Sequence, residues 1–245
     1  DRYGWFISDS SVRANLDWPR FLDIEIPLPS ISEQQKVVNV WKAFREIKEQ
    51  NEAKAKPLMQ VCQSYIQELK HKYETVEIGE FIEEVNERNS ESLYGGNNVR
   101  GLAVSKGLIG TKANLDGVSL TSYKILKPNE IAFVPDTSRR GDKMSLGIND
   151  TDEDYIVSSI SCVFKTDEKK LLPEYLYLWF CRPEFDRYAR FHSWGSARET
   201  FPFEEMKRLR LPIPPIDKQR AIISIYKCAQ EAQQIAEEAD RFSRE

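Results

Sequence analysis

The chain is poor in the residue types that build metal sites and disulfide frameworks. Its 245 residues include only four cysteines and two histidines, and no Cys-x-x-Cys pair occurs. This spacing argues against a structural zinc site and favours isolated buried thiols in a reducing compartment. No apolar run approaches the ~18 residues of a membrane span, and no basic-then-apolar signal stretch opens the sequence. We therefore expect a cytoplasmic protein that holds no metal or cofactor of its own.

Excess positive charge and catalytic signatures are also missing. Lysine and arginine number 35 against 39 acidic residues, which gives a net charge of −4. This balance excludes a globally basic DNA-binding chain, although a local basic patch remains compatible with it. The sequence has no P-loop, no Asn/Asp-Pro-Pro-aromatic motif of an adenine methyltransferase, and no Ser/His/Asp or Cys/His set. With 40% hydrophobic residues, the chain can still build a packed core.

One phrase occurs twice in the sequence. "IPLPSISEQQKVV" covers 26–38, and "LPIPPIDKQRAII" covers 211–223, 185 positions later. The match continues upstream, where Ser11 and Arg13 repeat as Ser196 and Arg198. We interpret each copy as a turn, a short helix, a short strand, a Pro-x-Pro connection and a helix start.

Each copy also carries a signal for the start of a helix. Ser32 or Asp217 offers a side-chain oxygen as N-cap, and Gln35 or Arg220 follows three positions later. The Ser-x-x-Gln pattern of the first copy is that of a capping box.

Long helices follow both copies. Apolar residues recur every three or four positions and predict a helix from Glu33 to His71, about 60 Å long. Pro57 should kink or split this helix. Similar spacing after the second copy predicts a shorter helix, whose alanines would permit close packing. We expect the two helices to form an antiparallel or coiled-coil pair, either with each other or between two chains.

Short β-rich runs fill the sequence between these helices. Turn residues separate runs such as "YKILK", "EIAFVP" and "YIVSSISCVFK". We expect helices at "IGEFIEEVNER" and "PEYLYLWFCRPEFDRYAR", besides the short helix of the second repeat copy. The pattern predicts an α/β (α+β) globular domain of about 140 residues, flanked by long α-helices that form a coiled-coil-like spacer.

The repeat and the closing segment "GSARETFPFEEMKRLRLPIPPIDKQRAI" resemble the specificity (S) subunit of a type I DNA restriction–modification enzyme. The resemblance implies a tail of a preceding target-recognition domain, a central spacer helix, a target-recognition domain and a distal spacer helix, at 1–29, 30–72, 73–215 and 216–245. A complete subunit of this family begins with a whole first domain. The resemblance therefore implies either a fragment or a half-sized subunit that pairs with a copy of itself through the spacer helices.

The resemblance also implies a function. The chain would read one half of a bipartite site in double-stranded DNA, and the helices would set the gap between half-sites. It would catalyse nothing itself but position methylation (M) subunits and a restriction/motor (R) subunit, which bring S-adenosylmethionine, ATP and Mg. Two alternatives stay open: a nuclease that uses Asp186, Glu205 and Lys207, and a helical scaffold that does not contact DNA.

Three polar, basic segments are candidates for DNA contact, at 134–145, 104–117 and 187–200. Recognition of bases and phosphates needs hydrogen-bond donors and cations, which these segments contain. The first segment also fits a solvated hairpin, and the second is broken by glycine turns. The third also fits a helix end with a buried tryptophan. "KRLR" at 207–210 fits either a phosphate contact or a short strand with solvated charges, and "NDTDEDY" should lie off the DNA face. The candidate DNA-contacting residues are Lys106, Lys112, Asn114, Thr137, Ser138, Arg139, Arg140, Lys143, Arg187, Arg190, His192, Trp194, Ser196 and Arg198.

Overall fold

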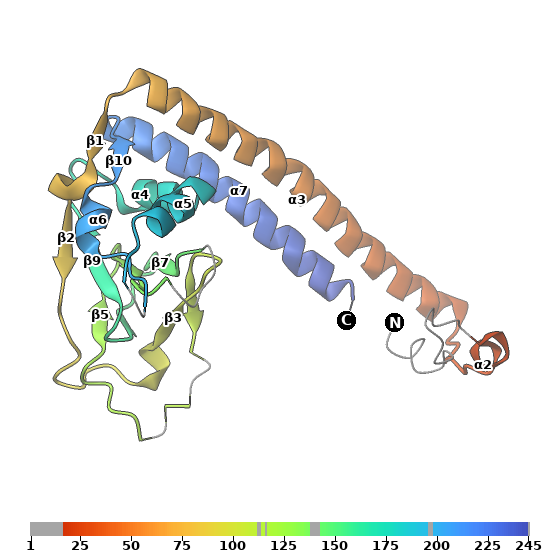
Figure 1. Ribbon diagram of the computed structural model, residues 1–245. Helices are drawn as coiled ribbons and strands as arrows, with labels where there is room; N and C mark the ends of the chain where they lie inside the picture. The colour runs from red at the N-terminus through yellow and green to blue at the C-terminus, as the bar shows by residue number, and fades with distance from the viewer. Residues whose placement is uncertain (1–16, 112–113, 116, 138–142, 196–197, 245) are drawn as a thin grey trace. The chain divides into compact units, whose positions relative to one another are not determined.

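The chain folds into two compact units, seen in a computed structural model that describes residues 17–111, 114–115, 117–137, 143–195 and 198–244 (Figure 1). The helical unit comprises residues 17–52 and 234–244 of the described chain, and the globular unit comprises residues 53–233. The long helices α3 (Ile31–Lys72) and α7 (Ile216–Phe242) contribute to both units. Within the described residues, no helix is long and apolar enough to cross a membrane.

Helix α3 has 42 residues and confirms the predicted long helix, although its start differs from the prediction. Ser30, not Ser32, is the capping residue: its Oγ accepts a hydrogen bond from the Glu33 N–H, and its own N–H donates to Glu33 Oε2 at 3.0 Å. The capping box therefore lies two residues earlier than predicted. Pro57 lies within the helix and does not split it. Its ring is on an exposed position, where water can hydrate the carbonyl that loses its partner.

In the helical unit, α3 and α7 run antiparallel. Lys48 Nζ contacts Asp240 Oδ1 at 2.7 Å, and the rings of Phe44 and Phe242 stack 5.7 Å apart. Buried alanines of α7, such as Ala236, have small side chains and so allow the two helices to approach closely. Of the two arrangements that the sequence left open, the chain adopts the pair within one molecule.

The globular unit combines antiparallel sheets with helices, which confirms the α+β class. Its largest sheet has four strands in the order β2-β9-β6-β7, and three two-stranded sheets pair β1 with β10, β3 with β4, and β5 with β8. The strands are β1 (Thr75–Glu77), β2 (Ile82–Val85), β3 (Arg100–Leu102), β4 (Leu108–Gly110), β5 (Lys124–Leu126), β6 (Ile131–Phe133), β7 (Leu146–Ile148), β8 (Tyr155–Val157), β9 (Cys162–Thr166) and β10 (Arg210–Pro212). The short helices are α2 (Trp18–Leu22), η1 (Ile78–Phe81), η2 (Gly96–Asn98), α4 (Pro173–Phe180), α5 (Pro183–Phe191) and α6 (Phe203–Lys207).

Two predicted helices differ from the structure. Residues 78–88 were expected to be helical, but only a 3-10 turn forms before strand β2, which pairs with β9 in the main sheet. Tertiary pairing thus overrides the helical preference of a glutamate-rich segment. The helix expected over 173–190 is broken into α4 and α5. Pro183 begins the second helix and holds Arg182 in an extended conformation, with φ −85° and ψ 145°.

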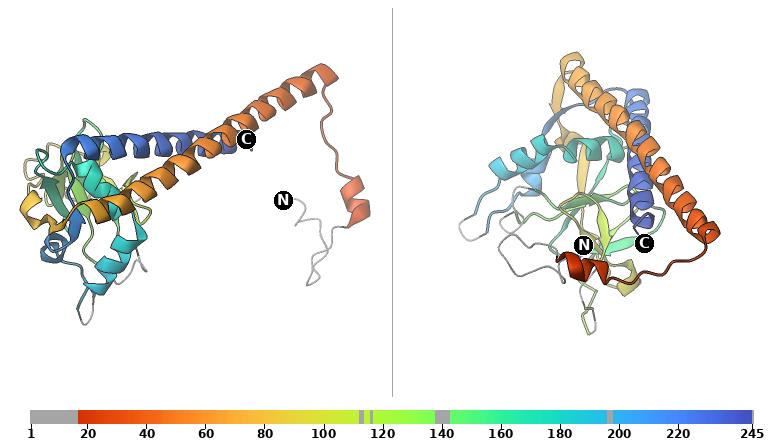
Figure 2. Two further views of the ribbon diagram at one scale, coloured as in Figure 1. Left: turned by 90° about the horizontal axis from the view of Figure 1, so that it is seen from above. Right: turned by 90° about the vertical axis from the view of Figure 1, so that its right-hand side faces the viewer.

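Aromatic side chains form the core of the globular unit. The Phe164 ring of β9 lies edge-on to Phe133 at 6.2 Å and packs against Phe203 at 5.6 Å. Helix α4 lies between α7 and the main sheet and buries Tyr175 and Phe180 in this core (Figure 2). Residues near the end of α3 and the beginning of α7 enter the same core, so both long helices are anchored in the globular unit.

The four cysteines are free thiols. Cys62 and Cys162 are buried, and burial raises the pKa of both thiols, which makes them poor nucleophiles. Cys228 is exposed on α7, so the expectation that all four thiols are buried is wrong for this residue.

A single glutamine joins the closing segment to the rest of the globular unit. Gln219, in the first turn of α7, is fully buried. Its Oε1 accepts from the Leu172 N–H at 2.8 Å, and its Nε2 donates to the carbonyls of Lys170 and Pro214 at 2.7 and 2.8 Å. One side-chain amide therefore hydrogen-bonds backbone groups of both the chain reversal before α4 and the Pro-x-Pro connection before α7.

We predict that Gln219→Ala destabilises the globular unit by about 2–3 kcal/mol, because it leaves buried backbone groups of three residues without partners. Urea denaturation, followed by circular dichroism, measures the change. The matched control is Gln230→Ala, an exposed glutamine on the same helix, which should change stability by less than about 0.5 kcal/mol. Equal effects of the two substitutions would contradict the role assigned to Gln219.

Candidate nucleic-acid interface

Helix α5 presents basic side chains on one face because its other face is buried. Phe185 and Ala189 lie four positions apart and pack into the core. Arg187 and Arg190 are exposed. Arg190 forms an ion pair with Glu199, which lies in the segment that follows the helix.

The segment after α5 folds back on itself and displays an indole. The backbone N–H groups of Trp194 and Thr200 each donate to the other residue's carbonyl, at 3.2 and 3.0 Å. Gly195 has a φ of +140°, and a Cβ there would lie 2.1 Å from the Arg198 carbonyl oxygen, so only glycine fits. This fold-back leaves the Trp194 side chain 54% exposed, and Arg198 is also exposed.

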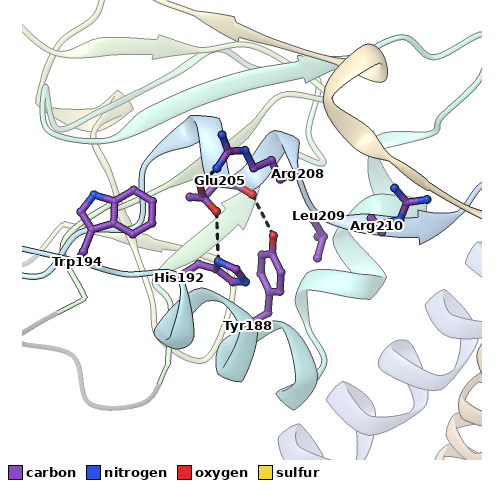
Figure 3. A pocket seen from close by; sticks show the side chains of 7 residues that line it. All are labelled: Tyr188, His192, Trp194, Glu205, Arg208, Leu209 and Arg210. Atoms are coloured by element: carbon purple, nitrogen blue, oxygen red, sulfur yellow. Dashed lines mark hydrogen bonds and ion pairs between the residues drawn. The ribbon is translucent and has the colours of Figure 1, made fainter.

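An open hollow of about 540 Å³ lies beside this fold-back, between the end of α5 and the α6–β10 connection (Figure 3). We call it the Glu205 hollow. Its walls come from consecutive parts of the stretch 188–210: the end of α5, the fold-back that follows it, and the end of α6 with the start of β10. Pairing of β10 with β1 and packing of α6 beside η1 hold the second wall in place. It is lined by Tyr188, His192, Trp194, Glu205, Arg208, Leu209 and Arg210.

The one acidic side chain of the hollow is neutralised by its neighbours. The Glu205 carboxylate is buried and contacts Arg208 Nη1 at 2.5 Å and His192 Nδ1 at 3.2 Å. The Tyr188 hydroxyl donates to the Glu205 carbonyl at 3.3 Å. Burial raises the pKa of Tyr188, and the Glu205 charge adds to the shift, so the phenol keeps the proton that it donates.

The hollow therefore presents cations and aromatic faces to solvent. The Arg208 and Arg210 side chains are exposed, and Arg210 is oriented by a hydrogen bond to the Thr75 carbonyl at 2.7 Å. Guanidinium groups bind phosphate oxygens, and an exposed indole offers a stacking surface for a base. This combination suits contact with a nucleic-acid backbone.

The three residues of the nuclease alternative each have a different partner. Asp186 Oδ1 contacts Lys106 Nζ at 2.5 Å and accepts from the Met144 N–H at 2.9 Å. Glu205 is held by Arg208 and His192, and Lys207 pairs with Glu204. The arrangement does not bring the two carboxylates and the lysine together on one metal-binding centre. No cluster of three metal-ligating side chains occurs among the described residues.

Two of the candidate DNA-contacting residues are buried against internal partners. Lys106 is 93% buried at its side chain, where it also donates to the Met144 carbonyl. Thr137 is buried, and its hydroxyl donates to the Glu199 carbonyl at 3.1 Å. Both side chains therefore serve internal packing rather than facing solvent.

The remaining candidates divide into two groups. Exposed positions on the globular unit are occupied by Asn114, Lys143, Arg187, Arg190 and Arg198, and the hollow contains His192 and Trp194. The other candidates lie outside the described residues: Lys112, Ser138, Arg139, Arg140 and Ser196.

Sequence reasoning did not select Tyr188, Arg208 and Arg210 as site residues. Arg208 and Arg210 belong to the "KRLR" stretch, for which phosphate contact and a solvated strand fitted equally well. The missing information was the pairing of β10 with β1, which fixes the side of the sheet on which Arg210 lies. Tyr188 stood in a basic-aromatic segment, but only the packing of α5 on α6 connects it with Glu205.

The chain was compared with known proteins and structures. Residues 71–231 match the model of the type I restriction modification DNA specificity domain. A search of curated proteins finds no match.

Two solved structures that match this chain are S subunits of restriction–modification systems. The S subunit of a type I restriction–modification system from M. genitalium is 12% identical, with a TM-score of 0.61 over 96% of this chain. The HsdS subunit from Thermoanaerobacter tengcongensis is 14% identical, with a TM-score of 0.43 over 99% of this chain. The matches span 64% of each of those chains. The first shows a shared fold.

The family model covers well over half of the sequence, from the end of α3 through the globular unit and into α7. It includes the closing segment and every residue of the Glu205 hollow. The chain therefore belongs to the family of type I restriction modification DNA specificity domains.

Proposed function

We propose that this chain is a sequence-specificity subunit that reads one half of a bipartite DNA target through residues 73–215. It catalyses nothing itself. It positions methylation subunits and a restriction/motor subunit, which bring S-adenosylmethionine, ATP and Mg. The observation that carries the proposal is the Glu205 hollow, where arginine and indole side chains of a DNA-specificity family member face solvent together.

Electrostatics supports a local rather than a global attraction to DNA. The chain is acidic overall, with a net charge of −4, so phosphate contact must come from a confined basic surface. The charge of Glu205 is compensated inside the hollow. The Arg210 guanidinium is paired only at the exposed surface, with Glu77 at 3.6 Å, and a phosphate could compete for it there. Exposed arginines of α5 and the fold-back extend this surface.

The helices support the spacer role in the same proposal. α3 and α7 are anchored in the core of the globular unit, and α3 alone continues for about 60 Å at 1.5 Å per residue. A rigid connector of this kind would hold two DNA-reading domains at a fixed separation, which a bipartite target requires.

Selection from a library of random DNA duplexes tests the proposal. The purified chain and its methylation partner are incubated with the library, and the bound duplexes are sequenced. A reader enriches one short sequence by about 1000-fold or more over unrelated duplexes. A helical scaffold leaves the library unchanged, and that result would exclude DNA reading.

Single substitutions in the hollow separate the two kinds of contact. Arg210→Ala should weaken binding to all duplexes and reduce the slope of log K against log salt by about 1, because one phosphate contact is lost. Trp194→Ala should cost about 1–3 kcal/mol of binding if its indole stacks on a base. Fluorescence anisotropy at several salt concentrations measures both effects.

Lys207→Ala is the matched control for these variants. It removes a cation three residues from Arg210. Like Arg210, Lys207 has an acidic partner, Glu204, but it does not line the hollow. Its binding and salt slope should equal those of the wild type. If the control loses as much affinity as Arg210→Ala, the hollow has no special part in DNA binding.

A further inference from the structure

Phe191, the last residue of α5, is 83% exposed, more than any other large apolar side chain that the structure describes. The helix buries Phe185 and Ala189, which fixes the side of α5 that faces the core. Phe191 lies on the opposite side, one turn after the exposed Arg187. One exposed apolar residue is ordinary on a protein surface, so its surroundings decide whether it has a function.

The Phe191 ring is held by a row of rings that begins in the Glu205 hollow. It lies at right angles to the His192 ring with centroids 5.0 Å apart, and His192 packs against Tyr188 at 4.3 Å. His192 Nδ1 contacts the buried Glu205 carboxylate at 3.2 Å. The backbone is fixed here as well, because the His192 N–H donates to the Tyr188 carbonyl at 3.0 Å. Phe191 therefore stands on a firmly held base.

Cations surround the exposed ring. Arg187 lies one turn before it on the same side of α5, and Arg190 directly precedes it. The hollow, which His192 also lines, presents Arg208 and Arg210. Arg190, Arg208 and Arg210 pair with carboxylates, but their side chains remain at least 44% exposed, so phosphates can reach them. An apolar ring among cations matches duplex DNA, in which phosphates flank stacked bases.

The chemistry of the ring limits what it can do on DNA. Phenylalanine has no hydrogen-bond donor or acceptor, so it cannot read a base edge in the way that arginine or asparagine does. Contact with a thymine methyl group would cover only one edge of the ring. Insertion between two base pairs covers its faces, and most of the Phe191 ring is open to solvent.

We propose that Phe191 is an apolar wedge, which inserts between two adjacent base pairs of the target and kinks the duplex there. The inference rests on the proposed function, because it takes the globular unit to bind double-stranded DNA. Insertion unstacks one base-pair step, and pyrimidine–purine steps such as TA and CA unstack most easily. Phe191 thus adds specificity at a step whose base edges it does not read.

Selection from random duplexes tests this added specificity. The wild-type chain and Phe191→Ala are each incubated with the library and the methylation partner. We expect both to enrich the same sequence, except that the preference for a pyrimidine–purine step at one position falls by about 5-fold or more in Phe191→Ala. Phe191→Leu keeps an apolar wedge and should keep the preference. Ile160→Ala is the control, since Ile160 is 63% exposed in the turn between β8 and β9.

Energy transfer between dyes at the two ends of the enriched duplex measures the kink. The wild-type chain, Phe191→Leu and Ile160→Ala should each bend the duplex by roughly 20–90°. Phe191→Ala should leave it nearly straight. The comparison is made at saturating protein, because loss of the ring also weakens binding by about 10-fold.

An unchanged step preference or an unchanged bend in Phe191→Ala would overturn the inference and leave the proposed function intact. If the wild-type chain enriches no sequence, both fail. If Phe191→Ala instead loses the methylation partner in sedimentation, the ring is a protein contact and the wedge is excluded. Thermal unfolding checks that the variants fold, and replacement of so exposed a side chain should shift the midpoint by less than about 2 °C.

Discussion

The buried amide of Gln219 connects the parts of the globular unit that function requires. It joins the reversal before α4 to the Pro-x-Pro connection before α7, and thereby fixes α6 and β10 between them. α6 and β10 carry Glu205, Arg208 and Arg210, so the position of the hollow depends on this closure. A buried amide makes such a joint specific, because each unmade hydrogen bond would leave a backbone group desolvated without a partner.

The same closure connects the hollow with helix α7. α7 begins two residues after the Pro-x-Pro connection and enters the core of the globular unit through Ile222 and Ile223. Movement of the helix relative to the hollow would therefore disrupt the core. If the globular unit reads DNA, as proposed, this joint would couple its position on DNA to helix α7. With a net charge of −4, the proposed attraction to DNA would depend on a local basic surface such as the hollow.

The spacing of apolar residues and the positions of turn residues predicted most of the helices and strands, because both are local signals in the sequence. The repeat predicted the short helix, the strand and the helix start of the second copy. Non-local pairing explains the failures: residues 78–88 look helical alone but supply β2 to the main sheet. The capping box was predicted two residues too late because Ser30 and Ser32 have the same side chain. Only the backbone geometry selects Ser30 as the capping residue.

For the site, the sequence located the basic-aromatic segment with His192 and Trp194 but could not join it to Arg208 and Arg210. Their proximity depends on tertiary packing. Lys106 was predicted wrongly for a related reason. A lysine in a glycine-rich turn is expected to be exposed, but the ion pair with Asp186, which is distant in sequence, buries it.

The most direct measurement is a genome-wide map of methylated adenines in cells that carry this chain and its methylation partner. A second map comes from cells in which residues 73–215 are replaced by another recognition domain. The account predicts that one half of the bipartite methylated motif changes while the other half is kept. Identical motifs in both maps, or no methylated adenine in either, would contradict the claim that these residues read DNA.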